Sequence, residues 1–242
     1  MTLYIAAPFG NYLYFNGVRS VRGSFTIEKR KGLLSQIVKT LRYTDGAWYN
    51  KIGLRNPGID WGIGKYKRER NDVLSLAAIE PGDWEQLNDI VPSDMDVELN
   101  LSCPNIDHFN NYSRGCELFL SGDGRRKVIA KLSPLIKATQ VEQLLQQGFT
   151  SFHCCNTLPT DKGGMSGKSL RVYVCQTMDF LYKYCEDPND LDIIAGGGIE
   201  DIDDISYYAY HGARSFSLGT VCFNPVKLHN ILRDMNGKIL FN

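Results

Sequence analysis

The 242-residue sequence lacks several features that would assign it at once to a class of proteins. It has no apolar run of about 18 residues, so no membrane-spanning helix is expected. Its 27 basic and 27 acidic residues cancel, which argues against a nucleic-acid or membrane surface as a partner. The apolar N-terminal run over residues 1–7 has no basic leader, and this predicts a first strand rather than a signal peptide.

Cysteine pairs at metal-binding spacing are also absent. The seven cysteines include no CxxC pair, which argues against a structural zinc site, any other metal site or a disulfide framework. We therefore expect a reducing compartment, the cytoplasm. Cys154 and Cys155 adjoin on an expected strand, and core packing is their predicted role.

The sequence has instead a repeated alternation of short apolar runs with helical patterning. Eight strands alternating with helices predict an α/β fold, a (β/α)8 TIM barrel, as a single domain over residues 1–242. Residues 8–21 are rich in Tyr, Asn and Gly without an amphipathic period, so the first helix is expected to be missing or reduced. The expected strands are 3–7, 22–26, 73–78, 96–102, 127–132, 149–156, 191–196 and 214–219, and the expected helices are 84–90, 137–147, 168–184, 201–211 and 225–235.

The most informative motif is Asn-Leu-Ser-Cys-Pro-Asn over residues 100–105, at the carboxyl end of an expected strand. Active sites of such barrels lie at these strand ends. The amides of Asn100 and Asn105 offer directional donors and acceptors to a planar ligand. Cys103, as a thiol with a free pKa of about 8.5, can accept a proton or attack a carbon. Cys103 is therefore the candidate catalytic residue.

This motif resembles the active-site sequence of the dihydroorotate dehydrogenases, FMN-dependent TIM barrels of pyrimidine biosynthesis. In the soluble branch of that family the cysteine is the catalytic base, whereas the membrane-associated, quinone-using branch has serine there. Dihydropyrimidine dehydrogenases carry a similar motif, but Asn105 fits the dihydroorotate enzymes better. The resemblance covers about residues 3–235 and implies a shortened member of the soluble, cysteine-using branch.

Glycines follow the last two expected strands, where TIM barrels usually bind phosphate. Glycine lets backbone N–H groups approach a phosphate without interference from Cβ. The sequence has no GxGxxG dinucleotide fingerprint, so FMN is expected rather than FAD. With the resemblance added, the expected cofactor-binding residues are Ala6, Ala7, Gly23, Ser24, Lys131, Ser166, Gly167, Gly197, Gly198, Gly219 and Thr220.

Lys131 ends an expected strand, and an ammonium there is costly to bury without a partner. The resemblance places such a lysine at the N1/O2 edge of the flavin, where it stabilises the charge of the reduced ring. Pairing with an acid at the barrel rim is the alternative. The family keeps a further lysine near the flavin and substrate, at positions that are Asn11 and Gly23 here, and Lys51 or Arg22 could supply that charge instead.

Asparagines recur at the strand ends and loops that would face a substrate. The loop from Asn50 to Leu54 resembles the family loop whose Asn and backbone N–H groups hold the orotate carboxylate, and donors around a glycine can converge on an anion. Asn156 and Thr157 resemble the pair that completes the pyrimidine contacts. The expected substrate-binding residues are Asn50, Ile52, Gly53, Leu54, Asn100, Asn105, Asn156 and Thr157.

The sequence and the resemblance together predict FMN-dependent oxidation of dihydroorotate to orotate, with Cys103 as general base. The partner is a small-molecule substrate, with no nucleic acid or membrane, and a homodimer is implied by family analogy alone. Two alternatives stay open. One is an oxidoreductase acting on another dihydropyrimidine. The other is a reduced, non-catalytic flavin-binding barrel, which the missing helix and lysine suggest.

Overall fold

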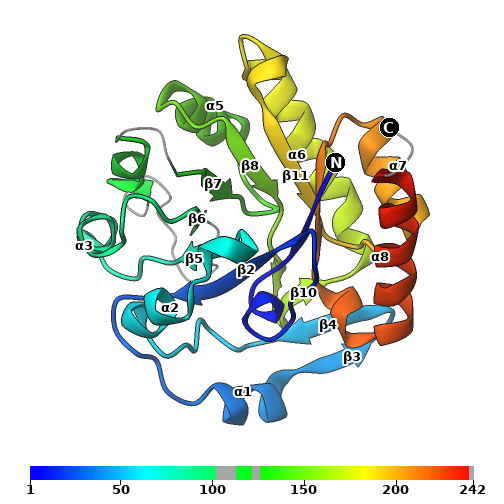
Figure 1. Ribbon diagram of the computed structural model, residues 1–242, viewed down its shortest axis with the longest axis horizontal. Helices are drawn as coiled ribbons and strands as arrows, with labels where there is room; N and C mark the ends of the chain where they lie inside the picture. Colours follow the sequence, from blue (N-terminus) through cyan, green and yellow to red (C-terminus); the bar gives the residue numbers. More distant parts are fainter. Residues whose placement is uncertain (102–112, 122–125, 240–242) are drawn as a thin grey trace.

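A closed barrel of eight parallel strands forms the centre of the molecule (Figure 1). The computed structural model describes residues 1–101, 113–121 and 126–239. All eight expected strands are confirmed, and the fold is the predicted α/β barrel. In their order around the barrel the strands are β1 (Thr2–Ile5), β12 (Ser215–Leu218), β11 (Asp192–Gly196), β8 (Ser151–Cys154), β7 (Val128–Lys131), β6 (Val97–Asn100), β5 (Val73–Leu76) and β2 (Val18–Phe25).

Helices cover the outside of the barrel, and the five expected ones are confirmed. Helix α5 shows why they form where predicted: Val141 and Leu144 bury one face, and Gly148, at φ +97°, follows its end. No helix in the described part of the chain is long and apolar enough to span a bilayer. The covering helices are α2 (Ile59–Lys65), α3 (Asp83–Ile90), α5 (Ala138–Gln146), α6 (Arg171–Tyr184), α7 (Ile202–Tyr210) and α8 (Pro225–Ile239).

The first crossover is short, as the sequence predicted. Between β1 and β2 the chain makes only a single 3₁₀ turn, η1 (Phe9–Asn11). Gly10 packs directly on β2: a Cβ added there would lie 2.2 Å from the carbonyl oxygen of Val21. The missing first helix is therefore a confirmed feature, and glycine allows the turn to press against the barrel.

A second sheet, which the sequence did not predict, lies beside the barrel (Figure 1). One hairpin is inserted after β2 and a second after β8, and they join through antiparallel β4 and β10, with Asn50 opposite Gly164. Trp48 and Phe223 attach this sheet to the barrel, with ring centroids 4.4 Å apart. The inserted elements are α1 (Leu33–Thr40), β3 (Arg42–Thr44), β4 (Ala47–Asn50), β9 (Leu158–Thr160) and β10 (Gly163–Ser166).

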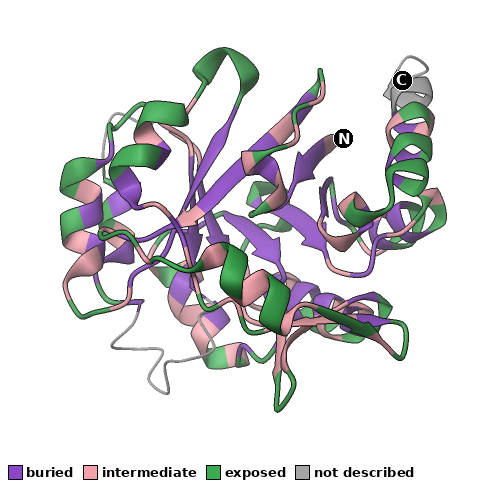
Figure 2. Ribbon diagram, turned by 90° about the horizontal axis from the view of Figure 1, so that it is seen from below, coloured by how far each residue is buried: buried purple, intermediate pink, exposed green. Residues whose placement is uncertain are grey.

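Residues along each barrel strand alternate between two environments. One set packs outward against the helices, including Phe152 and Phe216, and forms the main apolar core. A smaller apolar cluster comprises Tyr4, Val21, Val73, Ile129 and Ile194, one from each of five strands. Two positions after Val73 and Ile129 stand the polar residues Ser75 and Lys131. Figure 2 shows the barrel strands buried, while the hairpins of the second sheet are partly exposed.

An ion pair between β2 and the start of β5 is buried within this framework. Arg22 Nε lies 2.5 Å from Asp72 Oδ2, and the exposed fractions of the two side chains are 9% and 0%. The same Asp72 oxygen accepts a hydrogen bond from the backbone N–H of Lys67 at 2.9 Å. Arg22 is thus committed to a structural partner.

Loss of this buried pair is expected to destabilise the fold strongly. Asp72→Ala leaves the Arg22 guanidinium buried without a counter-charge, and it should lower the free energy of unfolding by about 3–5 kcal/mol. Asp94→Ala, which removes the exposed partner of Arg68, should cost only about 0–1 kcal/mol. Urea unfolding of both variants measures the difference, and equal losses would contradict this assignment.

Candidate active site

A cavity of about 820 Å³ opens at the carboxyl ends of the barrel strands, beneath the second sheet. Its size suits a small organic ligand. Residues of the second sheet, among them Asn50 and Gly164, contribute to its wall. Eleven of the predicted site residues line it: Ala7, Gly23, Ser24, Asn50, Ile52, Gly53, Leu54, Asn100, Lys131, Asn156 and Thr157.

Other predicted residues do not line this cavity. Cys103 and Asn105 lie outside the described residues, so their roles stay predictions. Ala6 is buried, and its N–H donates to the carbonyl of Leu218 at 2.9 Å. The residues predicted to bind the phosphate lie outside the lining of this cavity, at the ends of β10, β11 and β12: Ser166, Gly167, Gly197, Gly198, Gly219 and Thr220.

Amide and hydroxyl groups form a continuous row on the cavity wall. Asn156 Nδ2 donates to Asn100 Oδ1 at 3.3 Å, and Asn100 Nδ2 donates to Ser24 Oγ at 3.2 Å. Ser24 Oγ lies 2.8 Å from Ser75 Oγ deeper in the barrel. Three strands and the loop after a fourth therefore contribute one connected set of directional donors and acceptors, which suits a planar ligand rich in amides.

Beneath this row, a carboxylate that the sequence analysis missed organises the barrel interior. Glu98 Oε1 accepts from Ser75 Oγ at 2.9 Å and lies 3.6 Å from Lys131 Nζ. Glu98 Oε2 lies 2.7 Å from His153 Nδ1. The available signal was strand parity, because Glu98 precedes Asn100 by two residues and must face the same side of β6. Lys131 is therefore both a cavity residue and the partner of a buried acid.

The charges of this cluster follow from its burial and its partners. Burial disfavours the carboxylate of Glu98, but the charge of Lys131 and hydrogen bonds from His153 and Ser75 outweigh it, holding the pKa of Glu98 at about 2. Burial and the charge of Lys131 lower the pKa of His153, so the imidazole is neutral near pH 7. An ionised Glu98 only accepts hydrogen bonds, so His153 carries its proton on Nδ1.

Asn11 and Gly23, the positions of the lysine in the family that the sequence resembles, contact each other here. Asn11 clamps the backbone of Gly23: its Oδ1 accepts from the N–H at 3.0 Å, and its Nδ2 donates to the carbonyl at 3.3 Å. Both residues line the cavity but bring no charge. Of the two substitutes considered, Arg22 is excluded because it pairs with Asp72, whereas Lys51 lies in the cavity wall.

Three glycine loops beside the cavity offer backbone donors to an anion. Gly196 of β11 pairs with Ser217 of β12. Gly198 and Gly219, two residues after this pair, therefore follow the ends of two neighbouring strands. A Cβ on Gly198 would lie 2.7 Å from Lys168 Cα and 2.9 Å from the carbonyl of Gly167, so that loop is adjacent as well. Within the described chain, the N–H groups of Gly167, Gly198 and Gly219 donate to no acceptor. Such groups suit a phosphate.

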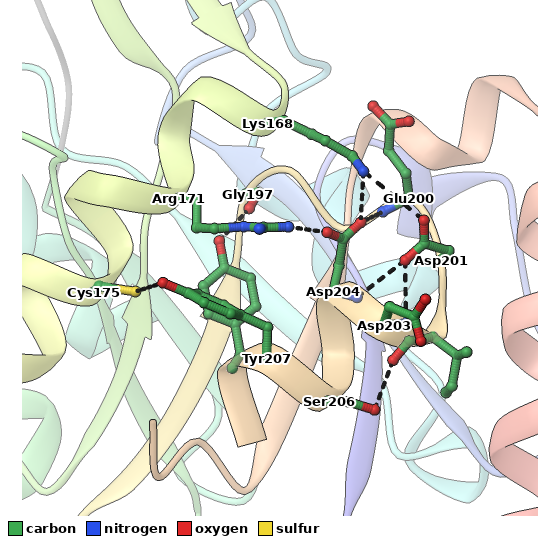
Figure 3. Close-up of polar contacts among 12 residues, drawn as sticks. Lys168, Arg171, Cys175, Gly197, Glu200, Asp201, Asp203, Asp204, Ser206 and Tyr207 are labelled. Carbon is green, nitrogen blue, oxygen red and sulfur yellow. Dashed lines mark hydrogen bonds and ion pairs between the residues drawn. The ribbon is translucent and has the colours of Figure 1, made fainter. Parts of the chain in front are cut away.

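The loop after β11 is held in shape from behind by Asp204, which is almost fully buried on α7 (Figure 3). Asp204 Oδ2 accepts from the N–H of Glu200 at 2.8 Å and lies 3.5 Å from Lys168 Nζ. Its other oxygen pairs with Arg171. The carboxylate therefore ties the loops that carry Gly167 and Gly198 to one another, before any ligand binds.

The fold is a (β/α)8 barrel whose cavity opens at the carboxyl ends of its strands, where such barrels usually bind their ligands. No protein-family model matches the sequence. The structure is similar to that of a dihydroorotate dehydrogenase from Eimeria tenella solved in complex with ferulenol. The TM-score is 0.73 at 17% identity, covering 100% of this chain and 83% of that one.

Curated proteins are also similar to the chain in sequence. The chain is 25% identical to the catalytic subunit of dihydroorotate dehydrogenase B (NAD(+)) from Exiguobacterium sibiricum, over 77% of this chain and 69% of the relative. It is 28% identical to the corresponding subunit from Endomicrobium trichonymphae, over 83% and 72%. The chain is thus similar in sequence to catalytic subunits of dihydroorotate dehydrogenase B, and similar in fold to a dihydroorotate dehydrogenase.

The Glu98 cluster predicts a specific loss of stability in acid. The pKa of Glu98 is about 2 when folded, against an ordinary value of 4.5, so the unfolded chain binds this proton first as the pH falls. The contribution is complete above pH 4.5 and is lost as the pH falls towards 2. Glu98→Gln should flatten this part of the curve of unfolding free energy against pH, measured by urea unfolding.

The exposed Glu69→Gln is the matched control and should leave that part of the curve unchanged. A Glu98→Gln curve parallel to that of the wild type down to pH 3 would mean that Glu98 is not held ionised by its neighbours.

Proposed function

We propose that this protein is an FMN-dependent dihydroorotate dehydrogenase that oxidises dihydroorotate to orotate. The observation that carries the proposal is the connected row of Asn156, Asn100 and Ser24, with Lys131 also in the cavity wall, in a chain similar to dihydroorotate dehydrogenases. Orotate and dihydroorotate are pyrimidinediones, whose ring carries alternating amide donors and acceptors. The row offers complementary groups in one plane of contact.

The residues present fit FMN. The free N–H groups of Gly167, Gly198 and Gly219 would hold its phosphate, and a Cβ built on Gly219 meets nothing within 4 Å, so that strand end is open. Ala7, Ser24 and Lys131 would lie along its ring system. When bound, FMN supplies the two-electron acceptor for the hydride from C6 of dihydroorotate.

The chain's own residues would bind the substrate, orient its ring and remove one proton from it. Asn100 and Asn156 would fix the ring through its amide edges, and the loop at Asn50 would close over it. Cys103 follows the end of β6 by three residues and would take the proton from C5 as general base. Lys131, held by Glu98, would place a positive charge where negative charge develops on the cofactor.

The proposal includes the cytoplasm as the site of the reaction. The support for it is the odd number of cysteines without CxxC pairs, which is typical of proteins from a reducing compartment. Cys154 and Cys155 are buried in the core, in agreement with their predicted packing role.

The purified protein is expected to be yellow, and anaerobic addition of dihydroorotate should bleach its flavin absorbance. Bleaching requires both bound flavin and transfer of a hydride, so it separates an enzyme from a protein that only binds flavin. Dihydrouracil and dihydrothymine added in parallel test for another dihydropyrimidine substrate. Mass analysis of the released cofactor should give FMN, and an adenine dinucleotide would contradict the single phosphate site.

Cys103→Ala is expected to keep its flavin and to lose most of its activity. Reduction of the flavin by dihydroorotate should slow by about 10²–10⁴-fold, the usual contribution of a positioned general base. Cys103→Ser should keep partial activity shifted to higher pH, because an unassisted hydroxyl is a weaker base than a thiol. Cys175→Ala, on the outer helix α6, is the control. Stopped-flow reduction at the wild-type rate in Cys103→Ala would contradict the role.

A further inference from the structure

The charged residues that line the cavity are all positive. Among the described residues that line it, six are Lys or Arg and none is Asp or Glu. Five of the six lie on two loops at the mouth, 29–31 and 51–55, and the sixth is Lys131. Lys131 is already neutralised by Glu98, at 3.6 Å. The uncompensated positive charge therefore lies on the two loops and not at the floor.

The two loops are joined to each other by hydrogen bonds. Arg30 and Asn56 are joined by paired backbone hydrogen bonds of 2.8 and 3.1 Å, and Arg55 Nη1 donates to the carbonyl of Lys31 at 3.2 Å. The buried Asn56 side chain fixes the two loops to the barrel, with Nδ2 donating to Thr26 Oγ1 at 2.9 Å and Oδ1 accepting from the N–H of Gly58 at 2.9 Å. The two backbone segments that carry Arg30 and Arg55 are thus joined to one another by the protein's own hydrogen bonds.

These two guanidinium groups have unused donors. The Nε atoms of both Arg30 and Arg55 are shut off from solvent and have no hydrogen-bond partner in the described part of the chain. Neither side chain pairs with a carboxylate among the described residues. Burial of Nε holds each guanidinium in place, and a guanidinium charge without a counter-ion among the described residues favours an anionic ligand in the cavity that both residues line.

We propose that Arg30 and Arg55 form a carboxylate-binding subsite at the mouth of the cavity, which selects ring compounds with an anionic group. Guanidinium is planar and matches a carboxylate through two parallel hydrogen bonds. The subsite adjoins the loop from Asn50 to Leu54 and supplies the charge that is absent at Asn11 and Gly23. The identity of the acid as dihydroorotate rests on the proposed function; the subsite itself does not.

Calorimetric titration of the purified, flavin-containing protein with three probes tests the subsite. Orotate has the ring and the carboxylate, uracil has the ring alone, and fumarate has carboxylates without the ring. The variants are Arg30→Gln, Arg55→Gln and the double variant, with Arg30→Lys and Arg55→Lys to restore charge without the planar fork. Arg68→Gln, an exposed arginine paired with Asp94 away from the cavity, is the matched control.

Each Gln variant is expected to weaken orotate binding by about 10- to 100-fold, as for loss of a charged hydrogen bond. Uracil binding should be unchanged, and the Lys variants should recover part of the loss. The affinity for orotate should fall with added salt in the wild type and much less in the double variant. A merely structural role would weaken both pyrimidines together.

Unchanged orotate affinity in the double variant would overturn the subsite, as would an equal loss for uracil. Wild-type protein that binds fumarate but not orotate would overturn the proposed function. In that case, loss of fumarate binding in the double variant would still support the subsite. If the wild type binds neither carboxylate, the subsite is wrong whatever the enzyme does.

Discussion

The ionised carboxylate of Glu98 is the interaction on which the site depends. It is buried inside a barrel, where an unpaired charge would cost several kcal/mol, so its neighbours must compensate for it. Lys131, His153 and Ser75 do so from three other strands. Through Ser75 the same carboxylate orients Ser24, and through Ser24 it orients Asn100. The positions of the cavity's polar groups are therefore consequences of one buried charge.

The barrel was predictable because most of its strands are short, largely apolar runs that are buried on both faces. The second sheet was not, because β3, β4, β9 and β10 have three or four residues each, some of them glycine, and pair only with one another. Their partners come from insertions more than one hundred residues apart in the sequence, as the pairing of Asn50 with Gly164 shows. Local periodicity carries no information about such a contact.

The candidate site was partly predictable for a related reason. Asparagines and glycines that follow apolar strands are visible in the sequence, and Asn50, Asn100 and Asn156 do meet at one cavity. Glu98 and His153 were missed because each is a single polar residue inside a strand, and only the register of β5 to β8 shows that they face each other. Sequence analysis therefore predicted site residues at the ends of strands but missed those inside the barrel.

The floor and the mouth of the cavity differ in charge. At the floor, Lys131 and Glu98 cancel and His153 is neutral, so the amide row presents hydrogen bonds with little net field. At the mouth, Arg30 and Arg55 lie on loops without carboxylate partners in the described chain. With the proposed subsite, a ligand with one anionic end and one neutral, amide-rich end would be stabilised in only one orientation, because reversing it would take the anion away from the arginines and leave their charge uncompensated. Under the proposed function, this orientation would bring the same edge of every bound ring to the amides, as removal of one particular proton requires.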